Sequence, residues 1–260
     1  MKIAPYDTDL TDRQWQLLEP LLPAAKKRGR PRTPLRAVCD AIFYMAKAGC
    51  PWRRLSTTFP PWKTVCHHFH QWSRNGLLGQ LNTPLRAWAR QAEDKRTRPS
   101  AGVLDSQTVR SNPHGGAVGY DAGKKTRGRK RFLLVDTLGL VLGAAVQPAH
   151  TPERAGAMAL LQSVLPHFTW LRQLWMVGGY TGQDFAAWVK TQRPQLEVEV
   201  IKRSDEVSGF RVLPKRWVVE RTFGWLMQHR RLVRDYEQSE ASATGWIFAA
   251  MIRVMLRRLA

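Results

Sequence analysis

Apolar residues recur at helical spacing through the first third of the chain. One such stretch begins after Thr11, a residue type that favours the N-cap of a helix, and is closed by Pro23. A second stretch covers residues 35–48, and Gly49 follows it where glycine is favoured after a helix. Further short helices are expected over residues 52–59 and 62–76. Short helices joined by tight turns are typical of helix-turn-helix domains, so the pattern predicts a small all-α unit.

Strand-like and helix-like patterns alternate along the rest of the chain. The expected strands cover residues 102–106, 131–137, 140–147, a part of 171–180, and 196–202. The expected helices cover residues 152–165 and 185–192, followed from residue 214 onwards by long amphipathic helices that break near 239–242. Three strands, a helix, a strand, a helix and a strand follow one another in RNase H-like cores. The predicted fold is therefore α/β: an RNase H-like core with a mixed five-stranded sheet, preceded by the helix-turn-helix-like domain.

A polar, charged stretch over residues 94–100, which contains Pro99, separates these two patterns. Such a stretch is typical of a linker. We therefore expect an N-terminal helical domain over residues 1–93, and the α/β domain with its C-terminal helices over residues 101–260.

The chain is strongly basic. Its 260 residues include 41 lysines and arginines against 20 acidic residues, which gives a net charge of +21 and a pI of about 10.9. Many of the basic residues are clustered in glycine-bearing runs over residues 26–32 and 123–131. Bound cations release the counterions of phosphates, so DNA explains such clusters better than solubility alone.

The candidate DNA-contacting side chains form four groups. They are Lys26, Lys27, Arg28, Arg30 and Arg32 in the first basic run; Lys63, His67 and Arg74 on the predicted helix over residues 62–76; Lys124, Lys125, Arg127, Arg129, Lys130 and Arg131 in the second basic run; and Arg216, Arg230 and Arg231 on the C-terminal helices. We expect the helix over residues 62–76 to enter the major groove, with the basic runs on the DNA backbone. A solvated basic hairpin is the alternative interpretation of the second run.

Two signals that would suggest another location are missing. No apolar run approaches the roughly 18–20 residues of a membrane span, and the N-terminus has no apolar signal segment, so we expect a cytoplasmic protein without membrane contact. The three cysteines lack CxxC spacing and are expected to be reduced thiols. A zinc site at Cys66 and the three histidines that follow it is an alternative, which no second cysteine pair supports.

Two acidic residues are candidates for chemistry. Asp105 follows an apolar strand pattern, where a carboxylate is costly to bury unless it is paired, and a divalent cation is the strongest partner. Glu220 lies one helical turn after Arg216 among aromatic residues, which can hold an acid in place as a metal ligand requires. A turn-capping aspartate and a solvated ion pair are the respective alternatives.

Ordered strings of residues resemble the transposases of IS-five-type insertion sequences, in the IS-four/IS-five superfamily. They are DSQTV at 105–109, GYDAGKK at 119–125, GRKR at 128–131, GGY at 178–180 and LPKRWVVERTF at 213–223, with GRPR at 29–32, GCPWR at 49–53 and FPPW at 59–62 in the N-terminal part. The resemblance covers nearly the whole chain. These strings are long and occur in order, so the resemblance is far more specific than a single short motif.

The resemblance implies a DDE enzyme, in which three carboxylates hold two Mg²⁺ or Mn²⁺ ions for cutting and joining DNA strands. By position, Asp105 is the first carboxylate and Glu220 the last, and Arg216 completes the family's signature of Arg, three residues and Glu. The implied partners are double-stranded DNA, both the terminal inverted repeats of an insertion sequence and target DNA. A homodimer or higher oligomer on DNA is implied as well, in association with the bacterial nucleoid.

The chain departs from the family at the middle carboxylate. The family places an aspartate directly before the Gly-Gly-Tyr string, where this chain has Val177. Because valine cannot ligate a metal, we predict severe catalytic loss with DNA binding largely kept. Three acids could substitute: Asp136, expected nearest because its strand lies beside the first; Glu153; and Asp184, expected rather as a charge at a helix start.

Three functions therefore compete. The first is a transposase impaired at Val177. The second is a catalytically inactive, transposase-derived DNA-binding protein or repressor. The third is an RNase H-like nuclease or resolvase unrelated to mobile elements, which is the weakest because the N-terminal and C-terminal motifs match transposases as a set.

Overall fold

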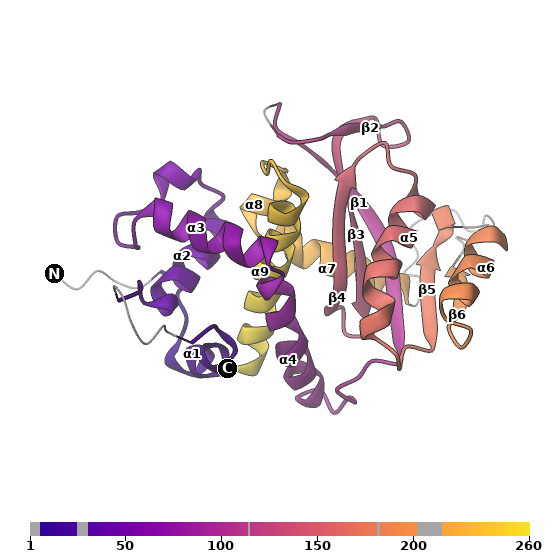
Figure 1. Ribbon diagram of the computed structural model, residues 1–260, viewed down its shortest axis with the longest axis horizontal. Coiled ribbons are helices and arrows are strands. Elements are labelled where there is room, and N and C mark those ends of the chain that lie inside the picture. The colour runs from indigo at the N-terminus through magenta and orange to yellow at the C-terminus, as the bar shows by residue number, and fades with distance from the viewer. Residues whose placement is uncertain (1–5, 25–30, 114, 181–182, 202–214) are drawn as a thin grey trace.

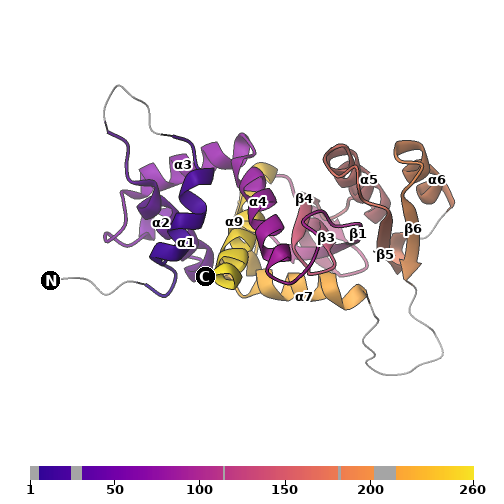
Figure 2. The ribbon, with the colours of Figure 1, turned by 90° about the horizontal axis from the view of Figure 1, so that it is seen from below.

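A long C-terminal helix separates a group of N-terminal helices from a mixed β-sheet (Figure 1). The computed structural model describes residues 6–24, 31–113, 115–180, 183–201 and 215–260. Seen at right angles, the same helix, α9 (Glu240–Leu259), lies between the first three N-terminal helices and the sheet (Figure 2). No helix in the described ranges is long and apolar enough to cross a membrane.

Local residue chemistry marks the start of the first N-terminal helix and the end of the second. They are α1 (Asp12–Leu18), α2 (Leu35–Ala48), α3 (Trp62–Arg74) and α4 (Leu77–Gln91). The Thr11 hydroxyl accepts a hydrogen bond from the backbone N–H of Gln14, whose side chain bonds back to the N–H of Thr11. Gly49 ends α2 in the left-handed conformation, at φ 70°.

Two helical predictions need correction. Only the 3₁₀ turn Trp52–Arg54 forms within the helix expected over residues 52–59. The Ser56 hydroxyl forms local hydrogen bonds with the N–H and the hydroxyl of Thr58, and such bonds compete with helix formation. Conversely, α4 was not predicted as a separate helix. It contains Pro84, a residue type that normally interrupts the helical pattern.

The sheet contains the five predicted strands and a short sixth one. The strands are β1 (Ala101–Arg110), β2 (Gly119–Asp121), β3 (Thr126–Asp136), β4 (Val141–Pro148), β5 (Gln173–Val177) and β6 (Glu197–Ile201). β3 runs antiparallel to β1, β2 and β4, whereas β5 and β6 run parallel to β1. The predicted α/β class and mixed sheet are confirmed, with β1 at the centre.

Alternating apolar side chains bury both faces of the sheet. One face carries Leu104, Phe132 and Leu134 and packs beneath α5 (Glu153–Val164) and α6 (Gln183–Gln192). The other face carries residues such as Val103 and Leu133 and packs against α7 (Arg216–Met227) and α9. Residues one apart in a strand point to opposite faces, so the two clusters follow directly from the β1 and β3 sequences.

One continuous apolar core joins the N-terminal helices to the sheet through α9. The Trp246 side chain of α9 is 1% exposed, and its ring stacks on Phe69 of α3 at 4.0 Å between centroids. α9 also contacts α4 and β4. A four-residue helix, α8 (Arg230–Val233), connects α7 towards α9 and contacts α2. The C-terminal segment is therefore a structural part of the N-terminal half as well as of the sheet.

Candidate active site and nucleic-acid interface

Asp105 lies where the pairing of β1 changes. β1 pairs with β3 along almost its whole length, as far as Arg110, but it pairs with β5 only as far as Leu104 opposite Met176. Asp105 therefore lies in the middle of a long strand, and its expected place at a strand end is corrected. Val177 is the last residue of β5. If the register is extended by one residue beyond the Leu104–Met176 pair, the Val177 backbone lies beside Asp105.

The Asp105 carboxyl is surrounded by charges. It keeps some solvent-accessible surface, yet burial is the main reason that its pKa rises to about 7. The N–H of Ser106 donates to Oδ1 at 2.7 Å, and the nearby Arg216 cation also lowers the pKa, while the carboxylates of Glu153 and Glu220 raise it. The charges of both glutamates therefore act on the Asp105 carboxyl, although the two side chains come from opposite faces of the sheet.

Glu220 and Arg216 lie on the face of the sheet that α7 covers. Arg216 Nε lies 2.8 Å from Glu220 Oε1, as their spacing of one helical turn predicts. The Thr222 hydroxyl donates to the Gly139 carbonyl at 2.8 Å, which fixes α7 to the turn after β3. Trp217, one of the aromatic residues around Glu220 that we expected to hold the acid in place, is 39% exposed, so its ring does not anchor the helix to the sheet.

A contact between β5, β6 and the start of α7 was not predicted from the sequence. Lys215, the residue before α7, lies 3.2 Å from Glu199 Oε2 and over the Trp175 ring at 4.6 Å. Trp175 Nε1 donates to the same Glu199 oxygen at 2.7 Å. These three residues place the beginning of α7, and hence Arg216, next to the strand that ends at Val177.

Glu153 reaches the same region from the other face. It is the first residue of α5, and a Cβ atom added to Gly179 would overlap its carboxylate. Gly179 lies two residues after Val177, in the 3₁₀ turn Gly178–Tyr180. The glutamate therefore occupies the space that a side chain at position 179 would fill.

Tyr180 closes this part of the site. Its side chain is 1% exposed, and its hydroxyl is buried without a hydrogen bond of good geometry. Burial raises its pKa, the Ser106 side chain lowers it, and the charges of Asp105 and Glu153 raise it further. The Tyr180 phenol therefore lies near Ser106, Asp105 and Glu153. In the sequence, only the Gly-Gly-Tyr string could have suggested this position.

The other two proposed substitutes for an aspartate at position 177 lie elsewhere. Asp136 pairs in register with Gly102, three residues before Asp105 towards the start of β1, because β3 runs antiparallel. It is fully buried and bound to Arg90 at 2.7 Å, so the expectation that it is the nearest substitute is wrong. Asp184 is exposed in the first turn of α6.

The donor atoms of the site suit a hard divalent cation, since Asp105, Glu153 and Glu220 offer only carboxylate oxygens. In the described residues, no three His, Cys, Asp or Glu side chains are close enough together to hold a metal ion, either here or at Cys66. The Arg216 guanidinium, paired with Glu220 and acting on Asp105, supplies the positive charge in this arrangement. The donors fit the ions in type, and side-chain rotation has to bring them together.

Helix α3 presents one exposed polar face. Lys63, His67 and Arg74 are exposed, as expected, and Gln71 joins them at helical spacing. His68 is half-buried, and burial lowers its pKa, so it lies at the side of this face. Arg53, exposed before the helix, lies 5.9 Å from the Trp62 ring. We call Lys63, His67, Gln71 and Arg74 the α3 face.

The second basic run divides into an exposed and a buried part. Lys124, Lys125 and Arg127 are exposed in the β2–β3 hairpin. Arg129, Lys130 and Arg131 are at most 7% exposed, because β3 begins at residue 126 and takes them into the sheet. Their partners are Asp235 for Arg129 at 3.4 Å, Asp121 for Lys130 at 3.7 Å and the Leu232 carbonyl for Arg131 at 2.6 Å.

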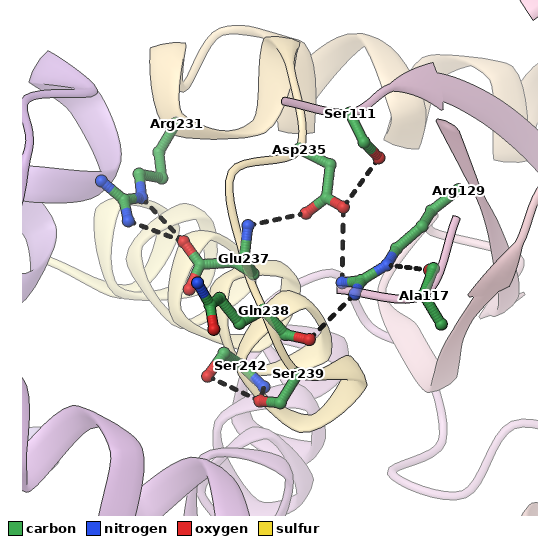
Figure 3. Close-up of polar contacts among 9 residues, drawn as sticks. All are labelled: Ser111, Ala117, Arg129, Arg231, Asp235, Glu237, Gln238, Ser239 and Ser242. Carbon is green, nitrogen blue, oxygen red and sulfur yellow. Dashed lines mark hydrogen bonds and ion pairs between the residues drawn. The ribbon is translucent and has the colours of Figure 1, made fainter. Parts of the chain in front are cut away.

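Arg129 and Arg231 belong to a buried network (Figure 3). Arg231 binds Glu237 at 2.6 Å, and Asp235 also accepts hydrogen bonds from the Ser111 hydroxyl and the Glu237 N–H. These arginines hold the segment between α8 and α9 against the end of β1. The buried cations are therefore structural and present little surface to DNA.

The remaining DNA-contact candidates have different positions. Arg32 and Arg230 are exposed, and Arg216 is half-buried beside Glu220. Lys26, Lys27, Arg28 and Arg30 lie outside the described residues.

Two family descriptions match the chain. Residues 10–82 match "Putative transposase of IS4/5 family", and residues 96–255 match "Transposase DDE domain". Over 106 residues the chain is 30% identical to the uncharacterized protein y4sN of Sinorhizobium fredii (strain NBRC 101917 / NGR234), which covers 40% of this chain and 78% of that protein. No solved structure matches the chain significantly. The family matches span both the N-terminal helices and the α/β part.

Proposed function

The chain belongs to the DDE transposases of the IS4/5 family, with an RNase H-like catalytic domain, and on this premise we propose that it binds the terminal inverted repeats of an insertion sequence and cuts and joins DNA strands there. The observation that carries the proposal is that Asp105 on β1 and Glu220 on α7, which packs against the same face of the sheet, lie near each other where β5 ends. Because its substrate is bacterial DNA, we place the protein in the cytoplasm, with the nucleoid.

Asp105 and Glu220 are the proposed metal ligands. Mg²⁺ or Mn²⁺, when bound, would activate the attacking water or 3′-hydroxyl and stabilise the leaving oxygen. Burial of Asp105 holds its carboxylate in one orientation, while the half-exposed Glu220 can turn towards it. Arg216 lowers the electrostatic cost of holding two acids together before cations arrive.

Val177 is expected to weaken this site. Its backbone lies beside Asp105, where the family carries an aspartate, and valine offers no oxygen to a metal. A lost carboxylate lowers affinity for the cations and leaves the remaining ligands less well oriented. We therefore propose slow strand cleavage with DNA binding retained.

DNA binding is proposed to use the exposed cations of the α3 face and of the β2–β3 hairpin. An exposed helix face of this size suits insertion into the major groove, and the hairpin lysines and arginine suit phosphate contacts. Two element ends have to be joined in transposition, so we propose a dimer or higher oligomer on DNA.

The test is strand cleavage of a DNA duplex carrying the inverted repeats that flank the gene, with Mg²⁺ or Mn²⁺. Asp105→Asn and Glu220→Gln are expected to abolish cleavage and to keep DNA affinity, measured by fluorescence anisotropy. Val177→Asp is expected to raise the cleavage rate by at least about tenfold over wild type, since it puts a carboxylate at the position where the family carries one. Cleavage by wild type as fast as by Val177→Asp would contradict the proposed impairment.

A binding-only protein, acting as a repressor of transposition, is the second candidate, and Val177 is the observation that favours it. The same assay separates the two functions. If wild type binds the repeats but cuts them no faster than Asp105→Asn, and Val177→Asp restores cutting, the chain is a DNA-binding descendant of an active enzyme.

A further inference from the structure

We propose that Glu153 provides the third carboxylate of the metal site, in place of an aspartate at position 177. The inference rests on the proposed function, because it names a ligand of the same site. It also predicts something that the family pattern does not: a ligand that comes from α5, rather than from the end of β5.

The first support is the path by which Glu153 reaches the site. Asp105 shares the face of the sheet with Val103 and α7, whereas α5 covers the opposite face. Beyond the end of β5 that strand no longer separates the two faces, because β1 pairs with β5 only as far as Leu104. Glu153 lies at the first position of α5 and extends over Gly179 into this opening. A glutamate has three rotatable bonds, enough to turn its carboxylate within the gap.

The second support is the space at Gly179. Any side chain there would displace the Glu153 carboxylate. The backbone just past Val177 therefore leaves room for an acid from another element, at the strand end where the family's own aspartate would lie. Among the three acids that could replace that aspartate, Glu153 reaches this strand end, whereas Asp136 is bound to Arg90 and Asp184 is exposed on α6.

The third support is a poorly paired polar group at the same place. The buried Tyr180 hydroxyl contacts the Ser106 side chain without a hydrogen bond of good geometry, and it lies beside Asp105 and Glu153. A buried hydroxyl without a well-formed hydrogen bond is costly. A hydrated cation bound at these carboxylates would bring water within its reach and would give the hydroxyl an acceptor.

Metal binding also balances the charges. Asp105, Glu153 and Glu220 together carry up to three negative charges, and Arg216 offers one positive charge. Like charges this close disfavour one another unless a cation is added. A divalent ion would offset the repulsion and draw the three carboxylates together. Among the described residues, and without a metal, the three are not close enough to form such a group.

The experiment measures the affinity of the full chain for Mn²⁺, without DNA, by titration followed through the EPR signal of the free ion. Glu153→Gln keeps the size and polarity of the side chain and removes its charge. We expect it to weaken Mn²⁺ binding by about tenfold or more. The added change Val177→Asp is expected to restore the affinity, because the family ligand then replaces the lost one.

Glu240→Gln is the matched control. Glu240 is also the first residue of a helix, α9, and is exposed, so its loss is expected to leave Mn²⁺ affinity unchanged. Circular dichroism and the thermal midpoint without metal report whether each variant is folded. If Glu153→Gln does not fold, Glu153→Asp is used in its place. We expect it to weaken Mn²⁺ binding less than Glu153→Gln would, because it keeps the carboxylate and only shortens its reach.

The outcomes separate this inference from the proposed function. If Asp105→Asn weakens Mn²⁺ binding and Glu153→Gln does not, the inference is overturned and the proposed function stands. If neither variant changes the affinity, or wild type binds no Mn²⁺ at millimolar concentration, both are overturned. A lower thermal midpoint for Glu153→Gln with unchanged Mn²⁺ affinity assigns the residue a structural role only, which also overturns the inference.

Discussion

At the scale of single residues, burial decides which ionisable groups are available for chemistry. His229, after α7, is 5% exposed, and burial lowers its pKa to about 4, with Arg253 and Lys47 adding to the effect. The Trp225 carbonyl, 3.2 Å from Nδ1, opposes it in part. The ring is therefore neutral in the folded protein under conditions where an exposed histidine takes up a proton.

This burial predicts a loss of stability in acid. Above the pKa of about 6.5 that histidine has in the unfolded chain, the His229 ring is neutral in both the folded and the unfolded state. As pH falls from about 6.5 towards 4, the unfolded chain takes up the proton first. The stability that the neutral His229 ring contributes is therefore lost over this pH range. Replacing His229 with Gln is expected to flatten this fall by about 2 kcal/mol at pH 4.5. Urea unfolding from pH 7 to 4.5 measures it. His167→Gln, an exposed control, should leave the wild-type slope unchanged.

The sequence identifies some candidate site residues better than others. Asp105 and Glu220 are found from motifs alone, because each lies within an ordered string typical of the family. The position of Glu153 beside the end of β5 could not be predicted, since it depends on where β5 ends and on the space at Gly179. The burial of Arg129 could not be predicted either, because it depends on β3 beginning five residues earlier than its apolar pattern indicates.

At the scale of elements, ion pairs hold the α8–α9 connection in place. The Asp235 N–H donates to the Arg110 carbonyl at 2.8 Å, and Ser111 pairs with Asp235 as a parallel bridge, so this segment extends the edge of β1. The Arg231–Glu237 pair lies beneath it, with both side chains 7% exposed. Arg231 also donates to the Cys50 carbonyl after α2, which ties this connection to the N-terminal helices.

Removing the Glu237 carboxylate from the Arg231–Glu237 ion pair is expected to lower the stability of the fold. Removing one partner of a buried ion pair leaves an unpaired charge and costs roughly 3–5 kcal/mol. Glu237→Ala should therefore lower the free energy of unfolding by about that amount, measured in urea, whereas Glu240→Ala, on the exposed first turn of α9, should change it by no more than roughly 0.5 kcal/mol. A loss below about 1 kcal/mol for Glu237→Ala would show that water reaches Arg231 and solvates it.

The elements themselves were predictable where local signals agree. The capping box at Thr11 and the glycine after α2 fix two helix ends, and the alternation along β1 and β3 fixes both faces of the sheet. α4 was not predictable, because tertiary contacts with α9 stabilise a helix that contains Pro84. β2 is three residues long and forms only against β3, so no local pattern marks it.

At the scale of the whole molecule, a net charge of +21 is divided between structural and exposed cations. The arginines of the core pair with acids or carbonyl groups, as Arg90 does with Asp136 and Arg253 with the Thr8 carbonyl. The exposed cations include those of the α3 face and of the β2–β3 hairpin, which extends beyond the sheet in Figure 1. Composition alone therefore overstates the charge available to DNA.

This division predicts how salt affects DNA binding. Each phosphate contact contributes about 0.9 to the slope of log affinity against log salt concentration on B-DNA. Replacing Lys124, Lys125 and Arg127 together with alanine should lower that slope by up to about 2.7, with a similar loss of affinity for every sequence, because phosphate contacts carry no sequence information. Anisotropy titrations between 50 and 300 mM KCl measure the slope.

Two further variants complete the test. Lys190→Ala removes an exposed cation of α6, away from both proposed surfaces, and should leave the slope and the affinity unchanged. Arg74→Ala on the α3 face should instead reduce the preference for the inverted repeats over unrelated DNA, by about 1–3 kcal/mol if Arg74 contacts a base edge. If the triple hairpin variant keeps the wild-type slope, the hairpin is a solvated basic loop, and the phosphate contacts must come from other cations of the chain.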